Sequence, residues 1–182
     1  MGSTECIPPR KRGQDDLYQE AAATFGAAIE RFSRGYEADP DRRRDLLQDI
    51  HLAMWRSFKG FNGRCSLRTW VYRVTHSVAT SHVIRQRRTN AALVSLDEIE
   101  SLPDHSAGQR AVDERQTLER LLTLIHRLTP VDRQVILSYL EGMDAASIGE
   151  IAGISAGNVS TKIHRIKNIL ARRFREGGSD EE

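Results

Sequence analysis

Residues Asp144 to Leu170 read DAASIGEIAGISAGNVSTKIHRIKNIL, and this stretch decides the fold of the C-terminal part of the chain. Asp144 is a favourable N-cap for a short helix, and Gly153 stands where that helix must end. Ser155 then caps a longer helix whose apolar residues recur at helical spacing. A short helix, a glycine-containing turn and a second helix form a helix-turn-helix motif.

The second helix of this motif is predicted to present polar and basic side chains to a ligand. We expect the outward positions to be Asn158, Ser160, Thr161, Lys162, His164 and Arg165. No acidic residue occurs between Ile151 and Arg175. In DNA-binding motifs of this type, early helix residues reach base edges while lysine and arginine neutralise phosphates. The pattern therefore favours DNA binding over an ordinary helical hairpin with a basic, solvent-exposed end.

The remaining apolar periodicity also predicts helices. A pattern from Asp15 to Phe32 is followed by one over residues 40–55, one from Ser66 onward and one from about Val112. Thr129-Pro130 supplies an N-cap with proline at the first helical position, which begins another helix. No strand pattern of useful length occurs, so we expect an all-α protein.

A second feature is a long basic window that contains aromatic residues. Between Asp49 and Asp97 the chain has no acidic residue, although a helix surface ordinarily mixes charges of both signs. Its basic residues are Arg56, Lys59, Arg64, Arg68, Arg73, Arg85, Arg87 and Arg88. Bases of opened DNA stack on aromatic rings while arginines follow the backbone. Trp70 and Tyr72 are either such rings or core residues.

Composition changes near Leu93 and indicates two domains. Residues 97–119 are rich in acids and also contain Pro103 and Gly108. We therefore expect two small helical domains (15–92 and 112–175, the second with the helix-turn-helix) joined by a flexible acidic linker (93–111). Residues 1–14 and 176–182 are expected to be disordered.

Several classes of function are disfavoured by what the sequence contains. Two cysteines, Cys6 and Cys65, are too few for a disulfide framework or a four-cysteine zinc site, although redox sensing by Cys65 stays an alternative to a half-buried structural role. The six histidines are scattered, and no phosphate-binding glycine loop or nucleophile elbow is present. We expect no enzyme, cofactor, metal or membrane insertion, and a cytoplasmic location because no secretory signal is visible.

Two segments resemble a known family. DLLQDIHLAMWRSFKGFNGRCSLRTWVYRV (residues 45–74) is similar to region 2 of the sigma-70 family, in particular its short extracytoplasmic-function (ECF) group. LTPVDRQVILSYLEGMDAASIGEIAGISAGNVSTKIHRIKNIL (residues 128–170) resembles region 4 of the same family. The resemblance implies a sigma factor that binds core RNA polymerase, recognises the −35 and −10 promoter elements and helps to open DNA. It also implies control by an anti-sigma factor or another regulator.

The resemblance assigns roles to individual residues. Docking on core polymerase falls to Asp45, Gln48, Asp49, Leu52 and Trp55. Capture of the opened −10 element falls to Asn62, Arg64, Ser66, Arg68, Trp70, Arg73, His76 and Ser77. The −35 element would meet Asn158, Ser160, Thr161, Lys162, His164 and Arg165.

Departures from the family pattern concern promoter sequence. Ser77 and Ser81 stand where many relatives carry Asn and Asp, and Ala156 and Ser160 replace common Glu and Lys. We therefore expect an unusual promoter element. Two alternatives remain: a stand-alone helix-turn-helix repressor or activator, and a decoy that holds polymerase or an inhibitor without initiating. Control by phosphorylation is a further possibility.

Overall fold

The computed structural model describes residues 13–87 and 114–176. Helix α1 (Gln14–Tyr36), α2 (Pro40–Ser57) and α3 (Leu67–Arg87) form one group, with the short 3₁₀ helix η1 (Phe58–Gly60) after α2. A second group comprises α5 (Glu114–Arg127), α6 (Pro130–Leu140), α7 (Ala145–Ala152) and α8 (Ala156–Glu176). All regular elements within these ranges are helical, which confirms the predicted all-α class. The predicted linker at 93–111 lies outside the described residues, as do residues 1–12 and 177–182 of the predicted termini.

Helix starts follow the capping residues of the sequence. The carboxylate of Asp39 accepts hydrogen bonds from the Asp41 and Arg42 amides, and Pro40 takes the first helical position of α2. Thr129 accepts from the amide of Asp132 at the start of α6. Such caps satisfy backbone donors that the first helical turn leaves without partners.

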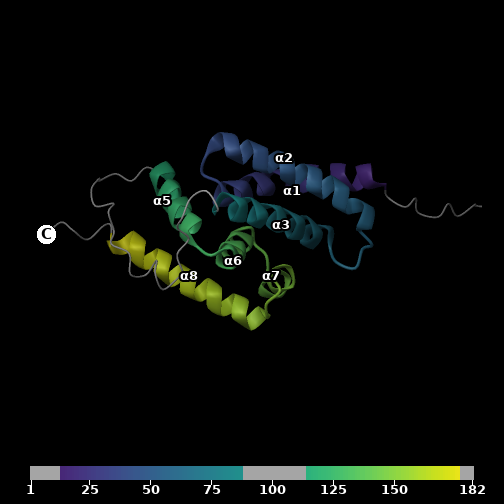
Figure 1. The fold of residues 1–182 in the computed structure, drawn as a ribbon. Helices are drawn as coiled ribbons and strands as arrows, with labels where there is room; N and C mark the ends of the chain where they lie inside the picture. Colours follow the sequence, from purple (N-terminus) through teal and green to yellow (C-terminus); the bar gives the residue numbers. More distant parts are fainter. Residues whose placement is uncertain (1–12, 88–113, 177–182) are drawn as a thin grey trace, which may run out of the picture.

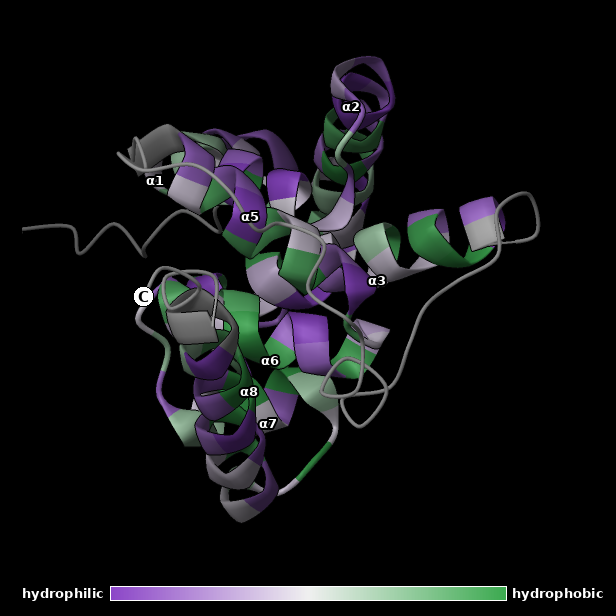
Figure 2. Cartoon of the chain, turned by 90° about the vertical axis from the view of Figure 1, so that its left-hand side faces the viewer, coloured by the Kyte–Doolittle hydropathy of each residue, from purple (hydrophilic) through white to green (hydrophobic). Residues whose placement is uncertain are grey.

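The first group encloses its core between three long helices. Phe32 of α1, Leu46 and Ile50 of α2 and Val71 of α3 are at most 1% exposed. Leu67, Val74 and Val78, which share the apolar stripe of Val71 on α3, pack against this core while partly buried. Figure 2 shows that each labelled helix carries both hydrophobic and hydrophilic residues, as expected of amphipathic helices.

The helix-turn-helix is formed by α7 and α8. Asp144 caps α7 through the amides of Ala146 and Ser147, and Gly153 ends it in the left-handed conformation at φ 70°. Ile148 and Val159 are fully buried in the crease between the two helices. Ile151, Ile154 and Ile163 pack against this core while partly buried.

The two groups pack against one another. Helix α6 lies between α3 and α8, and α7 contacts α3 (Figure 1). Arg133 of α6, only 2% exposed, donates to the backbone carbonyls of Ile125 and Leu128 and also to that of Tyr36 at the end of α1. Its guanidinium lies 5.3 Å from the centroid of the Tyr36 ring. The sequence did not predict this contact between the halves.

Candidate nucleic-acid and polymerase interfaces

The loop before α3 displays three of the predicted DNA-binding residues. Asn62, Arg64 and Ser66 are exposed. The side-chain oxygen of Asn62 accepts from the amide of Arg64 at 3.2 Å, and Gly63 between them has a φ of 74°. The side chain of Asn62 thus bonds to the backbone two residues on, which forms a local turn that Gly63 completes in the left-handed conformation.

Ser66 connects this loop to helix α3. Its hydroxyl accepts from the amide of Thr69 at 3.0 Å and lies 2.8 Å from the Thr69 hydroxyl oxygen. Ser66 therefore occupies the N-cap of α3. The helix start is fixed relative to the loop, which holds the exposed groups of Asn62 and Arg64 beside the basic part of α3.

Trp70 is anchored within the first group of helices. Its indole Nε1 donates to the hydroxyl of Ser57 at 2.9 Å, and its ring meets Phe61 edge to face at 5.4 Å between centroids. The side chain is half-buried and packs against the core. Trp70 thus contacts Phe61 of the loop and Ser57 of α2. A ring that stacks on a base would need one face open to solvent.

We use the name α3 face for Arg68, Arg73 and His76. Arg68 donates to the backbone carbonyl of Glu141 at 2.5 Å, and Arg73 forms an ion pair of 2.9 Å with Glu150. Both arginines of this face therefore bond to residues of the second group of helices. Ser77, the next residue, is exposed.

His76 is 2% exposed and lies in a chain of hydrogen bonds. Its Nδ1 is 2.8 Å from the hydroxyl of Tyr36, and its Nε2 is 3.1 Å from the hydroxyl of Ser138 on α6. Burial lowers the pKa of His76 well below that of a free histidine, which keeps the ring neutral. Burial also raises the pKa of Tyr36, although the nearby Arg133 opposes that shift.

The outer face of α2 presents the residues predicted to dock on polymerase. Asp45, Gln48 and Asp49 are exposed, and Leu52 and Trp55 are 46% and 36% exposed. Exposed apolar side chains rimmed by polar residues are typical of a protein-binding surface. Trp55 donates from Nε1 to the carboxylate of Asp15 at 2.8 Å, which fixes its orientation.

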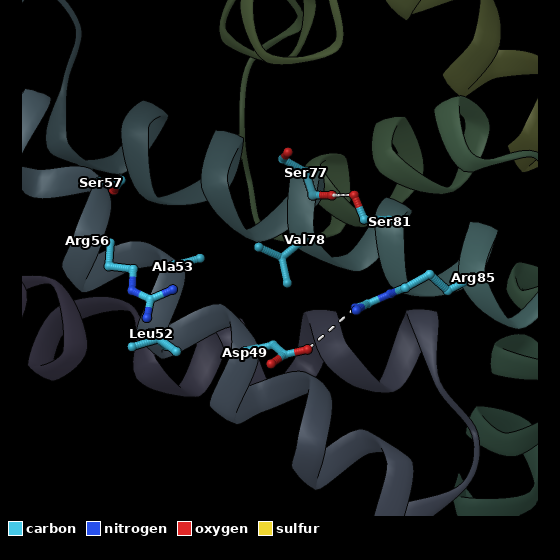
Figure 3. A pocket seen from close by; sticks show the side chains of 9 residues that line it. All are labelled: Asp49, Leu52, Ala53, Arg56, Ser57, Ser77, Val78, Ser81 and Arg85. Atoms are coloured by element: carbon cyan, nitrogen blue, oxygen red, sulfur yellow. Dashed lines mark hydrogen bonds and ion pairs between the residues drawn. The ribbon is translucent and has the colours of Figure 1, made fainter.

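An open groove of about 650 Å³ runs between α2 and α3 (Figure 3). Leu52, Ala53 and Val78 give it an apolar floor. Asp49 and Arg85 face one another at 3.5 Å at one end, while Ser77 and Ser81 lie along the α3 wall. The groove thus joins the α2 surface to the exposed part of α3, a relation that sequence spacing alone does not reveal.

Helix α8 exposes most of the residues predicted to read duplex DNA. Asn158, Ser160, Thr161, His164 and Arg165 are exposed. The hydroxyls of Ser160 and Thr161 donate back to the carbonyls of Ala156 and Gly157, at 3.1 and 3.0 Å.

Lys162 differs from the other predicted residues of α8 in being half-buried and paired. Its Nζ donates to Oδ1 of Asp132 at 2.7 Å, and the carboxylate of Asp132 is only 4% exposed. The other oxygen of that carboxylate accepts from the Thr129 hydroxyl at 2.6 Å. Lys162 thus ties the DNA-reading helix to the start of α6.

Neither metal chemistry nor a membrane span is indicated by the described residues. Across residues 13–87 and 114–176, no group of three or more His, Cys, Asp or Glu side chains is arranged to hold a metal ion. No helix in those ranges is long and apolar enough to cross a bilayer. Cys65 is half-buried.

Comparison with known proteins gives two family matches in chain order. Residues 27–89 match the family described as "Sigma-70 region 2", and residues 118–170 match "Sigma-70, region 4". Among curated proteins, the chain is 27% identical over 139 residues to the ECF RNA polymerase sigma-E factor of Haemophilus influenzae, covering 71% of this chain and 73% of that protein. It is 20% identical over 174 residues to the ECF RNA polymerase sigma factor SigW of Bacillus subtilis, covering 91% and 93%.

Solved structures show the same fold. The chain superimposes with a TM-score of 0.65 on the sigma factor RpoE of Bartonella quintana, which was solved in complex with the anti-sigma factor NepR. The two sequences are 18% identical, and the match covers 92% of this chain and 99% of that one.

Proposed function

Because the chain belongs to the sigma-70 family, and within it to the ECF group of sigma factors that direct promoter recognition, we propose a specific division of labour among its surfaces. The face of α2 with Asp45, Leu52 and Trp55 docks on core RNA polymerase. The loop 61–66 and the α3 face capture the opened −10 element, and the exposed residues of α8 read the −35 element. The domain limits proposed for these tasks are residues 15–92 and 112–175.

One observation supports this division above others. Two separate surfaces with DNA-binding chemistry stand on one chain in the order region 2, then region 4. Arginines and an Asn-Gly turn form the first, and a polar helix-turn-helix face forms the second. A stand-alone repressor needs only the second surface. The first surface would then have no function, so that alternative is not favoured.

We further propose that the protein is a non-catalytic partner of polymerase and acts in the cytoplasm. It lowers the free energy of the opened promoter by binding it, since unstacked bases and single-stranded backbone are its ligands. A regulatory protein of the anti-sigma class is proposed as a further partner, because the structurally similar RpoE was solved with one.

Reconstitution with core RNA polymerase tests the proposal. The purified chain should co-elute with core polymerase, and the resulting holoenzyme should start transcripts from a defined subset of genomic fragments whose upstream sequences share a motif. Association without any initiation would indicate a decoy. Failure to associate would contradict the proposal, and sequence-specific duplex binding without core would then support a repressor.

A further inference from the structure

The first turns of α1 contact the part of α2 that is proposed to dock on polymerase. Nε1 of the Trp55 indole donates to Oδ1 of Asp15 at 2.8 Å. The side-chain amide of Gln14 donates to the backbone carbonyl of Trp55, also at 2.8 Å. One helical turn earlier on α2, Nδ1 of His51 lies 3.2 Å from the hydroxyl of Tyr18. The side chain and the backbone of Trp55 are therefore both held by residues of α1.

Gln14, Asp15 and Tyr18 form what we call the α1 brace, and this brace is itself fixed to the fold. Leu17, between Asp15 and Tyr18 in this part of α1, is 7% exposed and belongs to the hydrophobic core. The ring of Tyr18 also meets that of His51 edge to face, at 6.0 Å between centroids. Because these contacts position the start of α1, the Asp15 carboxylate faces Trp55 from a helix that packs against α2.

Trp55 stays open to a partner although its polar atom is already bonded. The side chain is 36% exposed, and Leu52, one turn before it on α2, is 46% exposed. Nζ of Lys59 lies 5.8 Å from the centroid of the indole ring. Since Asp15 satisfies the only hydrogen-bond donor of the indole, the exposed remainder of the ring is apolar. Such a ring, held in one orientation beside a leucine, suits an apolar pocket on the partner.

A side chain that is fixed before binding strengthens an interface. A flexible side chain loses rotamer freedom when a partner immobilises it, and this loss weakens binding. A tryptophan that is already held by a hydrogen bond has given up that freedom in the free protein. The α1 brace thus has the position and the chemistry to prepare Trp55 for docking.

We propose that Asp15 is a positioning residue for polymerase docking, which holds the indole of Trp55 in the orientation that core RNA polymerase binds. Asp15 acts through Trp55 and does not itself touch polymerase. It precedes the segment that matches sigma-70 region 2, which begins at residue 27, so the docking surface depends on a turn outside the matched segment. This inference rests on the proposed function, because it adds a residue to the docking surface named there.

Substitutions at Asp15 separate the hydrogen bond from the charge. Asp15→Ala removes the acceptor, whereas Asp15→Asn removes only the charge, because an amide oxygen still accepts from an indole N–H. Asp16→Ala is the matched control, since it removes an acid of the same helical turn whose carboxylate bonds instead to the amide of Gly13, at 3.0 Å. Each full-length variant is titrated against core RNA polymerase, and urea denaturation measures its stability.

Positioning by a hydrogen bond predicts a distinct pattern of affinities. Asp15→Ala should bind core polymerase about two- to ten-fold more weakly than wild type, the range that corresponds to immobilising one side chain. Asp15→Asn and Asp16→Ala should bind like wild type. Equal weakening by Asp15→Ala and Asp15→Asn would assign the effect to charge and overturn the inference. Wild-type affinity in Asp15→Ala, or an equal loss in Asp16→Ala, would overturn it as well.

Combination with Trp55→Phe tests whether Asp15 acts through the indole. Phenylalanine keeps an apolar ring but offers no donor to Asp15. In this background Asp15→Ala should cause no further loss of affinity for core polymerase. A further loss as large as that in the wild-type background would mean that the two residues act independently, which contradicts the inference.

The indole signal of Trp55 gives a readout that does not depend on polymerase. The chain contains two tryptophans, so NMR spectra of the isotope-labelled protein hold two indole N–H signals, and Trp55→Phe identifies the one from Trp55. Asp15→Ala should move this signal toward the position of an indole in water, and Asp15→Asn and Asp16→Ala should leave it near its wild-type position. A signal that does not move in Asp15→Ala contradicts the inference. Failure of wild type itself to bind core polymerase would contradict the proposed function instead.

Discussion

Lys162, on the helix proposed to read the −35 element, donates a hydrogen bond of 2.7 Å to the buried carboxylate of Asp132 on α6. The pair joins the helix-turn-helix to the helix that precedes it. A lysine held in this way fixes the position of α8 relative to α6.

Lys162→Met should therefore act mainly on stability. Loss of the ammonium leaves one oxygen of a buried carboxylate without its partner, which costs on the order of 1–3 kcal/mol in the free energy of unfolding. Urea denaturation measures this cost. Lys167→Met on α8 is the control, because the Lys167 ammonium makes only exposed contacts, 5.5 Å from the Tyr139 ring centroid and 3.5 Å from its hydroxyl oxygen, so its loss should cost at most about 1 kcal/mol.

The salt dependence of DNA binding separates Lys162 from a phosphate ligand. Replacing a lysine or arginine that neutralises a phosphate reduces the slope of log K against log salt concentration by about 1. We expect Arg165→Ala to show that reduction on duplex promoter DNA and Lys162→Met to keep the wild-type slope. A reduced slope in Lys162→Met would show that the lysine leaves Asp132 when DNA binds.

The backbone conformation of the loop before α3 requires glycine at position 63. Gly63 has a φ of 74°, a conformation that costs an L residue roughly 1–2 kcal/mol. Gly63→Ala should thus disturb the turn that presents Asn62 and Arg64 and slow promoter opening, measured by permanganate footprinting. Gly60→Ala, where nothing lies within 4 Å of the added Cβ, should behave like wild type, and both variants should bind core polymerase normally.

Acid should destabilise the chain through buried histidine. The folded pKa of His76 lies well below its unfolded value of about 6.5, so the unfolded chain binds more protons once the pH falls under that value. Stability present above pH ~6.5 is then lost as the pH drops, at up to about 1.4 kcal/mol per pH unit for one proton.

His76→Gln should reduce the loss between pH ~6.5 and ~5, because glutamine does not titrate. His51 and His126, whose pKa values are also lowered first of all by burial, contribute to the loss in the same direction. Thermal denaturation across this range measures the slope. If stability falls with pH at the same slope in wild type and in His76→Gln, solvent reaches His76 before the chain unfolds.

Docking on polymerase should depend on Leu52. The side chain is 46% exposed and lies beside acids on α2, so Leu52→Glu should weaken core binding by on the order of ten-fold with little change in stability. Leu118→Glu on α5, where the side chain is 48% exposed, is the control and should keep wild-type affinity. Surface plasmon resonance with immobilised core polymerase measures the affinities of both variants.

Local chemistry made much of the fold predictable. Thr129 and Asp144 begin α6 and α7 because their side-chain oxygens satisfy free amides, and this is visible in the sequence alone. Val71, Val159 and Ile148 lie in cores because helical periodicity places them there. The all-α class and the helix-turn-helix were confirmed for that reason.

Contacts between distant parts of the chain were not predictable in the same way. His76 and Ser138 are 62 positions apart, and each looks like an ordinary polar residue of an exposed helix face. Arg133 likewise looks like a surface arginine, yet four carbonyls surround it. Their burial depends on how two helix groups fit together, which periodicity within one helix does not encode. The roles proposed for the individual DNA-binding residues stay predictions.

The Tyr36–His76–Ser138 chain also sets how easily the two halves part. A hydroxyl, a neutral imidazole and a second hydroxyl can each exchange their bond for one to water at little net cost. The surrounding ion pairs, Arg31–Glu141 and Arg73–Glu150, hydrate equally well once separated. Together with the packing of Leu137 against Gly35, these polar groups give the junction the mixed character of contacts between domains of one chain, for which relative motion is the default expectation unless the interface is large and hydrophobic.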